Sequence, residues 1–371
     1  MCIEQLAHRT KVIDASGIRK VFALAAELDH PINFSIGQPN FEVPDAIKRA
    51  AIEAIEQGFN RYSQTAGEQA LRQRIGPSLT SELGWADPNV LITSGVSAGI
   101  LLTFLALINP GDEVIIPDPY FVIYKHVINM LGGKCVFVDS YPDFNLPVDK
   151  IAQHISPKTK LIIVNSPSNP TGVVYSRDEL KALAKVAEAH DAIVMSDEIY
   201  KPFTYDSDYP SMASVYDKTL LLRGFGKAYA ITGWRMGYVA AHPCLNPVLE
   251  EMVKIQQYTF VCAPTPFQRA AIAAFDVDIS PIVAQYRYKR DLICSALADH
   301  FEFTKPGGAF YLFVKAPQGS ATKLVERAIA NNVLVIPGNV FSEQDTYFRI
   351  SYATDNATIE RGCAILRSLV D

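Results

Sequence analysis

The strongest constraint on the fold is a regular alternation, through the middle of the chain, between short apolar segments and longer helix-like ones. The short, strand-like segments are residues 90–92, 113–116, 134–138, 161–164, 192–195 and 219–222. The helix-like segments between them are residues 97–108, 120–131 and 178–190. Such alternation is typical of βαβ units, in which parallel strands form one sheet and the connecting helices cover its two faces. We therefore predict an α/β fold with a mostly parallel sheet.

One segment, residues 89–110, carries no charged side chain and is long enough to suggest a membrane-spanning helix. It is interrupted at Ser94 and Gly95, however, directly after a run that contains β-branched residues. A buried strand, a tight turn and a buried helix account for this pattern better than a membrane span does. The first eleven residues also lack the apolar core of a signal peptide. We therefore expect a cytoplasmic protein without membrane association.

The length of 371 residues favours two domains, because single hydrophobic cores rarely grow beyond about 250–300 residues. From about residue 285 the alternation gives way to a charged helix, short extended segments and further helices. We predict a large domain over residues 46–284 and a small α+β domain over residues 285–371. Residues 1–45, which include a predicted helix at 18–28, are expected to belong to the small domain.

The composition argues against nucleic-acid binding and against a metal or disulfide framework. The net charge is −5, and no cluster of basic residues stands out. The six cysteines are dispersed without a C-x-x-C pair, and the seven histidines form no H-E-x-x-H motif. We expect no nucleic-acid partner, no metal site and a reducing compartment.

The first candidate for chemistry is a lysine in the segment TLLLRGFGKAYAITGWRMGYV, residues 219–239. Lys227 follows the predicted strand at 219–222, and Gly224 and Gly226 allow the chain to turn sharply there. Ligands of open α/β sheets bind at the carboxyl edge of the strands, where this lysine is expected to lie. Taken alone, a lysine is far more often a solvated surface charge. The segment is also no P-loop, since that motif needs an earlier glycine and a Ser or Thr after the lysine.

Polar residues also follow the other predicted strands, and parallel strands bring their carboxyl ends to one edge of the sheet. The segments are SGVS at 94–97, DPYF at 118–121, NSPSNPTG at 165–172 and SDEIY at 196–200. Together with Arg235, eight residues beyond Lys227, they predict one site built from several loops. By itself, Asp197 could be a loop carboxylate or, with Glu198, half of a metal site.

The motifs NSPSNPTG, SDEIY, GFGKAYAITGWRMGY and RISYA resemble those of the class I pyridoxal-phosphate aminotransferases of fold type I. The resemblance extends from about residue 13 to the C-terminus. It implies a fold type I transferase with a mostly parallel seven-stranded sheet flanked by helices and a smaller α+β domain. It also implies pyridoxal 5′-phosphate as the cofactor and a homodimer as the working form.

The resemblance assigns the groups that hold the cofactor's ring. Lys227 would form a Schiff base with the cofactor aldehyde and then carry the proton to and from the substrate's α-carbon. Asp197 would pair with the protonated ring nitrogen through a charge-assisted hydrogen bond. Asn169 and Tyr200 match the partners of the phenolic oxygen.

The cofactor phosphate needs hydrogen-bond donors. Backbone amides at Gly95, Val96 and Ser97 open a predicted helix, whose N-terminus suits an anion. Arg235 can bind a phosphate in bidentate fashion. Tyr62 matches a tyrosine that members of the family supply from the neighbouring subunit, so a monomer would hold an incomplete site.

For the substrate, Arg349 matches the arginine that binds the α-carboxylate, a role that suits a planar guanidinium. Gly37, in the sequence IGQP, and Asn169 match neighbouring substrate contacts. The segment around Ile18 is expected to close over the substrate and exclude water.

Three positions leave questions within this resemblance. Phe121 matches the aromatic residue that stacks on the cofactor ring, but it could be an ordinary core residue because Tyr120 is adjacent. Many members with acidic substrates carry a lysine where Ser97 stands, which puts a preference for aspartate in doubt. Many members also carry Ser or Ala where Gly226 stands, so one hydroxyl for the phosphate is missing here.

We therefore predict an aminotransferase that moves an amino group from an L-amino acid to a 2-oxo acid such as 2-oxoglutarate, by a ping-pong route through pyridoxamine phosphate. The donor could be aspartate, an aromatic amino acid or another neutral amino acid. Two alternatives stay open: a carbon-sulfur lyase or decarboxylase of the same fold, and a non-catalytic, cofactor-binding regulatory module. The acidic charge and the lack of a helix-turn-helix segment disfavour the regulatory module.

Overall fold

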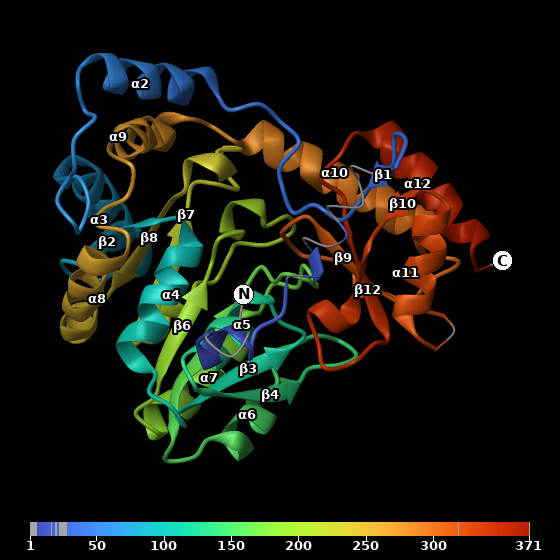
Figure 1. Cartoon of the computed structure of the whole chain (residues 1–371), viewed down its shortest axis with the longest axis horizontal. Helices are drawn as coiled ribbons and strands as arrows, with labels where there is room; N and C mark the ends of the chain where they lie inside the picture. Colours follow the sequence, from blue (N-terminus) through green and yellow to red (C-terminus); the bar gives the residue numbers. More distant parts are fainter. Residues whose placement is uncertain (1–5, 16, 19–20, 22–27, 318, 371) are drawn as a thin grey trace.

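The computed structural model describes residues 6–15, 17–18, 21, 28–317 and 319–370, and a seven-stranded sheet forms its centre (Figure 1). In spatial order the strands are β2 (Asn89–Ser94), β8 (Met236–Ala241), β7 (Thr219–Gly224), β6 (Ile193–Asp197), β5 (Thr159–Asn165), β3 (Glu113–Asp118) and β4 (Lys134–Asp139). Strand β8 runs antiparallel to both of its neighbours, and the other strands are parallel to one another. The prediction of a mostly parallel α/β sheet is confirmed.

Helices cover both faces of this sheet, as the apolar pattern predicts. One face packs against α4 (Val96–Leu107), α5 (Ile123–Met130) and α8 (Asn246–Thr259). The other face packs against α6 (Val148–His154), α7 (Arg177–Ala189), α2 (Asp45–Glu56), α3 (Gln69–Leu83) and α9 (Thr265–Ala273). Within β7, Leu220 and Leu222 join the first core while Leu221 joins the second, because successive side chains of a strand point to opposite faces.

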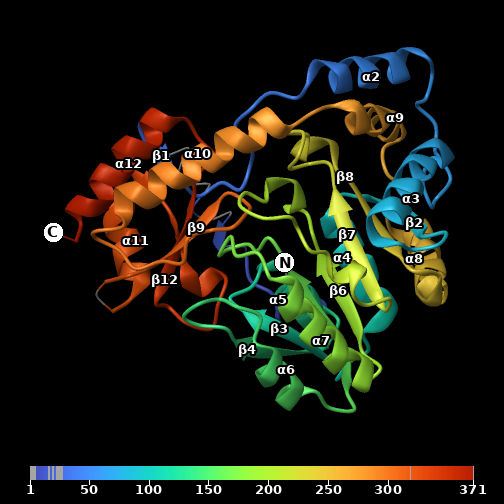
Figure 2. The same cartoon turned by 180° about the vertical axis from the view of Figure 1, so that it is seen from behind.

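The C-terminal part of the chain forms a smaller lobe around an antiparallel sheet of β11 (Ile336–Pro337), β12 (Tyr347–Ser351) and β9 (Tyr311–Lys315). Helices α11 (Ala321–Ala330) and α12 (Asn356–Ser368) belong to this lobe. Figure 2 shows α10 (Ser280–Leu297) extending from α9 toward it.

The N-terminal segment reaches this lobe through one short strand. β1 (Ile32–Asn33) pairs in parallel with β10 (Val333–Leu334). Helix α10 continues through the predicted junction at residues 284 and 285, so the division into two domains stays a prediction. Most of the helix predicted at 18–28 lies outside the described residues. Across the described ranges, each helix is too short or too polar to cross a bilayer.

Candidate active site

A cavity of about 730 Å³ lies where the carboxyl ends of the parallel strands meet the smaller lobe. Twelve of the thirteen predicted site residues line it, and they come from both lobes. These are Ile18, Gly37, Gly95, Val96, Ser97, Phe121, Asn169, Asp197, Tyr200, Lys227, Arg235 and Arg349. The exception, Tyr62, does not line the cavity. The loops therefore converge as expected for ligand binding at the carboxyl edge of an open α/β sheet.

Lys227 lies in the turn after β7, and its Nζ donates a hydrogen bond to the backbone oxygen of Gly37. Burial lowers the pKa of Lys227 to about 8, and the positive charges of Arg349 and Arg235 act in the same direction. Asp197 acts in the opposite direction. A lysine with such a pKa holds part of its amine in the neutral, nucleophilic form near neutral pH.

Asp197, the last residue of β6, is 2% exposed. Its Oδ2 accepts a hydrogen bond of 2.8 Å from the Tyr124 hydroxyl, and its Oδ1 accepts one of 3.2 Å from the Ile199 backbone N–H. Burial raises the pKa of Asp197 to about 6, although these two hydrogen bonds oppose the change. The carboxylate is therefore mainly ionised at pH 7 and can pair with a cationic N–H group.

Glu198 is not positioned to share a metal with Asp197. Its Oε2 pairs with the guanidinium of Arg223 at 2.7 Å. Its Oε1 accepts hydrogen bonds from the hydroxyls of Ser196 and Ser211, at 3.0 and 2.6 Å. This buried network anchors the segment after β6 and occupies both oxygens of the Glu198 carboxylate. Within the described residues, no group of His, Cys, Asp and Glu is arranged to hold a metal ion.

Arg349, on β12, is 1% exposed and has no carboxylate partner within the described residues. Its Nη1 donates to Asn169 Oδ1 at 2.9 Å, and its Nη2 donates to the Ser35 backbone oxygen at 2.7 Å. Its buried Nε lacks a hydrogen-bond partner in the described part of the chain. A buried guanidinium without a counter-charge is costly, so this arrangement favours binding of an anion such as a carboxylate.

A second position that suits an anion is the N-terminus of α4. Gly95 adopts φ +76° there, and a Cβ at this residue would lie 2.6 Å from Arg235 Nη2. Arg235 is exposed and lines the cavity, and its Nη1 donates to the Thr232 backbone oxygen at 3.1 Å. The helix N-terminus and the guanidinium together suit a phosphate group. The residues present thus fit the cofactor that the sequence motifs imply.

The adjacent aromatic residues Tyr120 and Phe121 have different environments. Tyr120 is 4% exposed and donates to Glu343 Oε1 at 2.7 Å. Phe121 is half-buried, lines the cavity and lies edge-on to Tyr124 at 5.9 Å between ring centroids. Phe121 is therefore the member of the pair that is available to a ligand ring.

Tyr62 lies on the surface, 84% exposed. The loop around it is held firmly, since Thr265 Oγ1 donates to the Arg61 backbone oxygen at 2.7 Å and Gln268 Nε2 donates to Ser63 Oγ at 2.9 Å. Within its own chain, Tyr62 does not contribute to the cavity.

Three residues to which the sequence analysis gave no individual role also support the site. Tyr124 holds Asp197, Asn165 Nδ2 donates to the Asp197 backbone oxygen at 3.0 Å, and Tyr311 approaches Tyr200. Asn165 directly follows an apolar run and begins a motif, so the sequence contained a signal for it. Tyr124 and Tyr311 lie in apolar contexts that indicate ordinary core residues.

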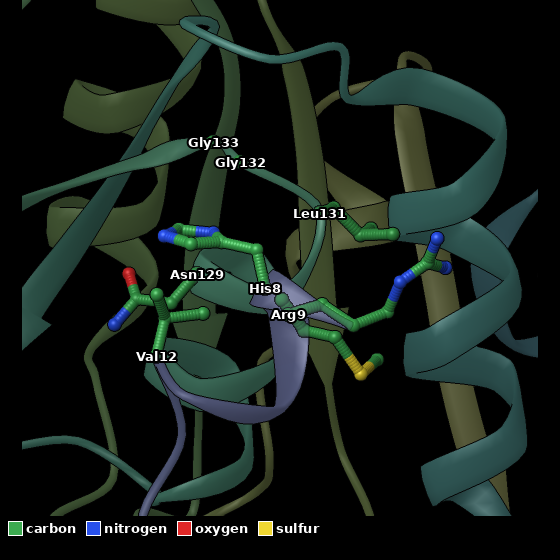
Figure 3. Close-up of a pocket in the computed structure, with 8 residues that line it drawn as sticks. His8, Arg9, Val12, Asn129, Leu131, Gly132 and Gly133 are labelled. Atoms are coloured by element: carbon green, nitrogen blue, oxygen red, sulfur yellow. The ribbon is translucent and has the colours of Figure 1, made fainter. Parts of the chain in front are cut away.

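Another hollow, of about 610 Å³, lies between the short helix η2 (His8–Thr10) and the end of α5 (Figure 3). Figure 3 shows His8 and Arg9 pointing in different directions over the turn at Leu131–Gly133. The lining of this hollow contains no acidic side chain and no lysine. The larger cavity, which contains Lys227 and Asp197, is therefore the candidate active site.

Comparisons with known proteins agree with this geometry. The family described as "Aminotransferase class I and II" matches residues 29–366. A "Probable aspartate aminotransferase" of Methanocaldococcus jannaschii is 39% identical, over 99% of this chain and 100% of its own. An "Aromatic-amino-acid aminotransferase 2" of Thermococcus litoralis is 34% identical, over 96% of this chain and 95% of its own. A solved aspartate aminotransferase from Thermus thermophilus with maleate has a TM-score of 0.93 at 31% identity, covering 98% of this chain and 99% of its own. The chain therefore belongs to the class I and II aminotransferases, which are enzymes that depend on pyridoxal 5′-phosphate.

Proposed function

We propose that this enzyme transfers the amino group of an L-amino acid to a 2-oxo acid such as 2-oxoglutarate, in two half-reactions that follow a ping-pong order. The observation that carries the proposal is the meeting, in one cavity, of the Lys227 amine, the Asp197 carboxylate and the Arg349 guanidinium, which has no carboxylate partner among the described residues. These are the three groups needed to hold the cofactor covalently, to hold its ring nitrogen and to bind an amino acid.

When bound, pyridoxal 5′-phosphate supplies an aldehyde and a ring that acts as an electron sink. Lys227 would hold it covalently, and Asp197 would keep its ring nitrogen protonated. Asn169 and Tyr200 would contact its phenolic oxygen. Once a substrate replaces Lys227, the neutral amine at Nζ can accept the proton from the substrate's α-carbon as a general base. It can then donate that proton again as a general acid.

The remaining cavity residues would orient the cofactor and the substrate. The backbone amides of residues 95–97 and the Arg235 guanidinium would bind the phosphate, and Phe121 would stack on the ring. Arg349 would bind the substrate's α-carboxylate beside Gly37. Ile18, which lines the cavity from the N-terminal segment, would help to close it against water.

Arg349→Lys is expected to raise the KM for the amino acid by roughly 10- to 100-fold, because lysine lacks the planar pair of donors that matches a carboxylate. Cofactor absorbance and cofactor affinity should stay near those of the native protein. Steady-state kinetics at saturating acceptor, with an absorbance titration of the cofactor, checks both. An unchanged KM would remove Arg349 from the substrate site.

We further propose a homodimer in which Tyr62 of each chain reaches the phosphate site of the other. The firm attachment of its loop, together with its 84% exposure, supports a role outside its own chain. An exposed tyrosine without such a role would have little reason to be held in this way.

Tyr62→Phe is expected to weaken cofactor retention by roughly three- to tenfold, since one hydrogen bond to the phosphate is lost. Dialysis followed by absorbance measures the retention, and Tyr288→Phe is the matched control because Tyr288 is also exposed, at 58%. Sedimentation gives the oligomeric state. A fully active monomer, or equal retention in the two variants, contradicts the shared site.

The identity of the donor is best tested with a panel of the twenty amino acids, each added to the loaded enzyme without an acceptor. A transaminase converts the cofactor stoichiometrically to its aminated form and then stops. A carbon-sulfur lyase or decarboxylase turns over without acceptor, and a regulatory module shows no conversion. The names of the relatives support aspartate and aromatic donors as the first to test.

We also propose a reducing, cytoplasmic location and a two-domain division. The free cysteines Cys135, Cys244, Cys262, Cys294 and Cys363 support the location. The pairing of β1 with β10 supports an association of residues 1–45 with residues 285–371. Residues 46–284 would then form the large domain.

A further inference from the structure

A buried tyrosine of the smaller lobe, Tyr311, contacts three groups of the candidate site. It is 1% exposed, and it lines the main cavity from β9. Its hydroxyl oxygen lies 2.7 Å from that of Tyr200. The Arg349 guanidinium carbon lies 4.5 Å from the centre of its ring. A Cβ at Gly37 would lie only 2.1 Å from its hydroxyl oxygen, so Gly37 leaves the space in which this hydroxyl sits.

The register of the small sheet fixes these contacts. Tyr311 pairs with Ser351, and Arg349 pairs with Phe313. Tyr311 and Arg349 are thus diagonal neighbours on the same face of β9 and β12, within reach of an aromatic ring and a guanidinium. Strand pairing therefore places the ring of Tyr311 under the Arg349 guanidinium.

The contact between the two hydroxyls has a direct consequence, because a phenol has one proton to donate. If Tyr200 donated to Tyr311, its proton would be unavailable to a cofactor. If Tyr311 donates to Tyr200 instead, the Tyr200 proton is free to point into the cavity. Among the described residues, the hydrogen-bond partner of the Tyr311 hydroxyl is Tyr200. Once the Tyr200 proton is donated to a cofactor, the hydrogen bond between the two hydroxyls requires Tyr311 to be the donor, which is the second arrangement.

We propose that Tyr311 is a positioning residue, whose hydroxyl donates to Tyr200 and so directs the Tyr200 proton to the cofactor's phenolic oxygen, and whose ring supports Arg349. The inference rests on the proposed function, since it acts through Tyr200 and Arg349. A hydroxyl that accepts one hydrogen bond is a stronger donor of another. Donation to the phenolic oxygen favours its anionic form and therefore lowers the pH at which the bound cofactor changes its visible absorbance.

The test is a spectroscopic pH titration of the loaded enzyme with Tyr200→Phe, Tyr311→Phe and the double variant. We expect Tyr200→Phe to raise the midpoint by about one pH unit and Tyr311→Phe to raise it by about half a unit. The double variant should match Tyr200→Phe, because Tyr311 acts through the hydroxyl that is already absent. The other charged or titratable groups that face the pair are the same in all three variants: Asp197, Lys227, Arg349, Tyr124 and Tyr286.

A second readout separates the hydroxyl of Tyr311 from its ring. Tyr311→Phe keeps the ring under Arg349 and should leave the KM for the amino acid within about twofold of the native value. Tyr311→Leu removes the ring and should raise that KM roughly three- to fivefold. Circular dichroism verifies that both variants fold.

An unshifted midpoint in Tyr311→Phe overturns the proposal, and so does an equal shift with and without the Tyr200 hydroxyl. Either result leaves the cofactor role of Tyr200 intact. If Tyr200→Phe itself leaves the midpoint unchanged, the role of Tyr311 is overturned together with that of Tyr200. The two failures are therefore distinguishable.

Discussion

Lys227→Ala is expected to lower kcat by at least about 10⁴-fold, because it removes the amine that is proposed both to hold the cofactor and to move the α-proton. The purified variant should also lose the visible absorbance of covalently held cofactor. Stopped-flow and steady-state assays with cofactor in excess measure the first effect, and an absorbance spectrum after gel filtration measures the second.

Lys218→Ala is the matched control for this experiment. Lys218 lies just before β7, at the opposite end of the strand from Lys227, and pairs with Asp191 on the surface. Its replacement should leave kcat and the spectrum near native values. Full activity in Lys227→Ala contradicts the assignment of the catalytic amine.

Asp197→Asn is expected to lower kcat by roughly 10³-fold, because an amide cannot hold a protonated ring nitrogen as a carboxylate does. Cofactor should still bind, since Lys227 and the phosphate groups are unchanged. The measurement is kcat normalised to the bound cofactor, which is read from absorbance after alkaline release.

Tyr124→Phe is a milder change at the same carboxylate and serves as the comparison for Asp197→Asn. It keeps the carboxylate and removes only the 2.8 Å hydrogen bond to Asp197, so a loss of about tenfold or less is expected. If Asp197→Asn retained more than a tenth of native activity, the carboxylate would not be the partner of the ring nitrogen.

The fold was predictable because local pattern and tertiary structure agree at its centre. The apolar run at β7, with side chains alternating between two cores, and the glycines that follow it predict a buried strand ending in a turn. Helix α3 was missed, although Leu71, Ile75 and Leu79 have helical spacing. Gly76 and Pro77 interrupt that pattern with residues that disfavour helix interiors, and packing of the apolar face compensates for them.

The position of a site residue was predictable where a recognisable sequence motif contains it. Lys227, Asp197 and Asn169 are such residues, and all three line the cavity. The roles themselves stay predictions. Tyr311 could not be found in this way, because its proposed role depends on a contact with Tyr200, 111 residues away in the chain. Its sequence context, between apolar residues in GAFYLFV, is that of an ordinary core strand. Such a contact becomes visible only when strand pairing and loop placement are both known.

The central claim is that Lys227 holds the cofactor covalently. Among the described residues that line the cavity, Lys227 is the one lysine. The most direct measurement is borohydride reduction of the loaded enzyme, which makes that bond permanent, followed by proteolysis and mass spectrometry of the peptides. We expect a single modified peptide that contains the sequence GFGKAYAITGWR, residues 224–235, with the added mass on Lys227. Modification of a different lysine, or a fully loaded enzyme whose Lys227 peptide is unmodified, would contradict it.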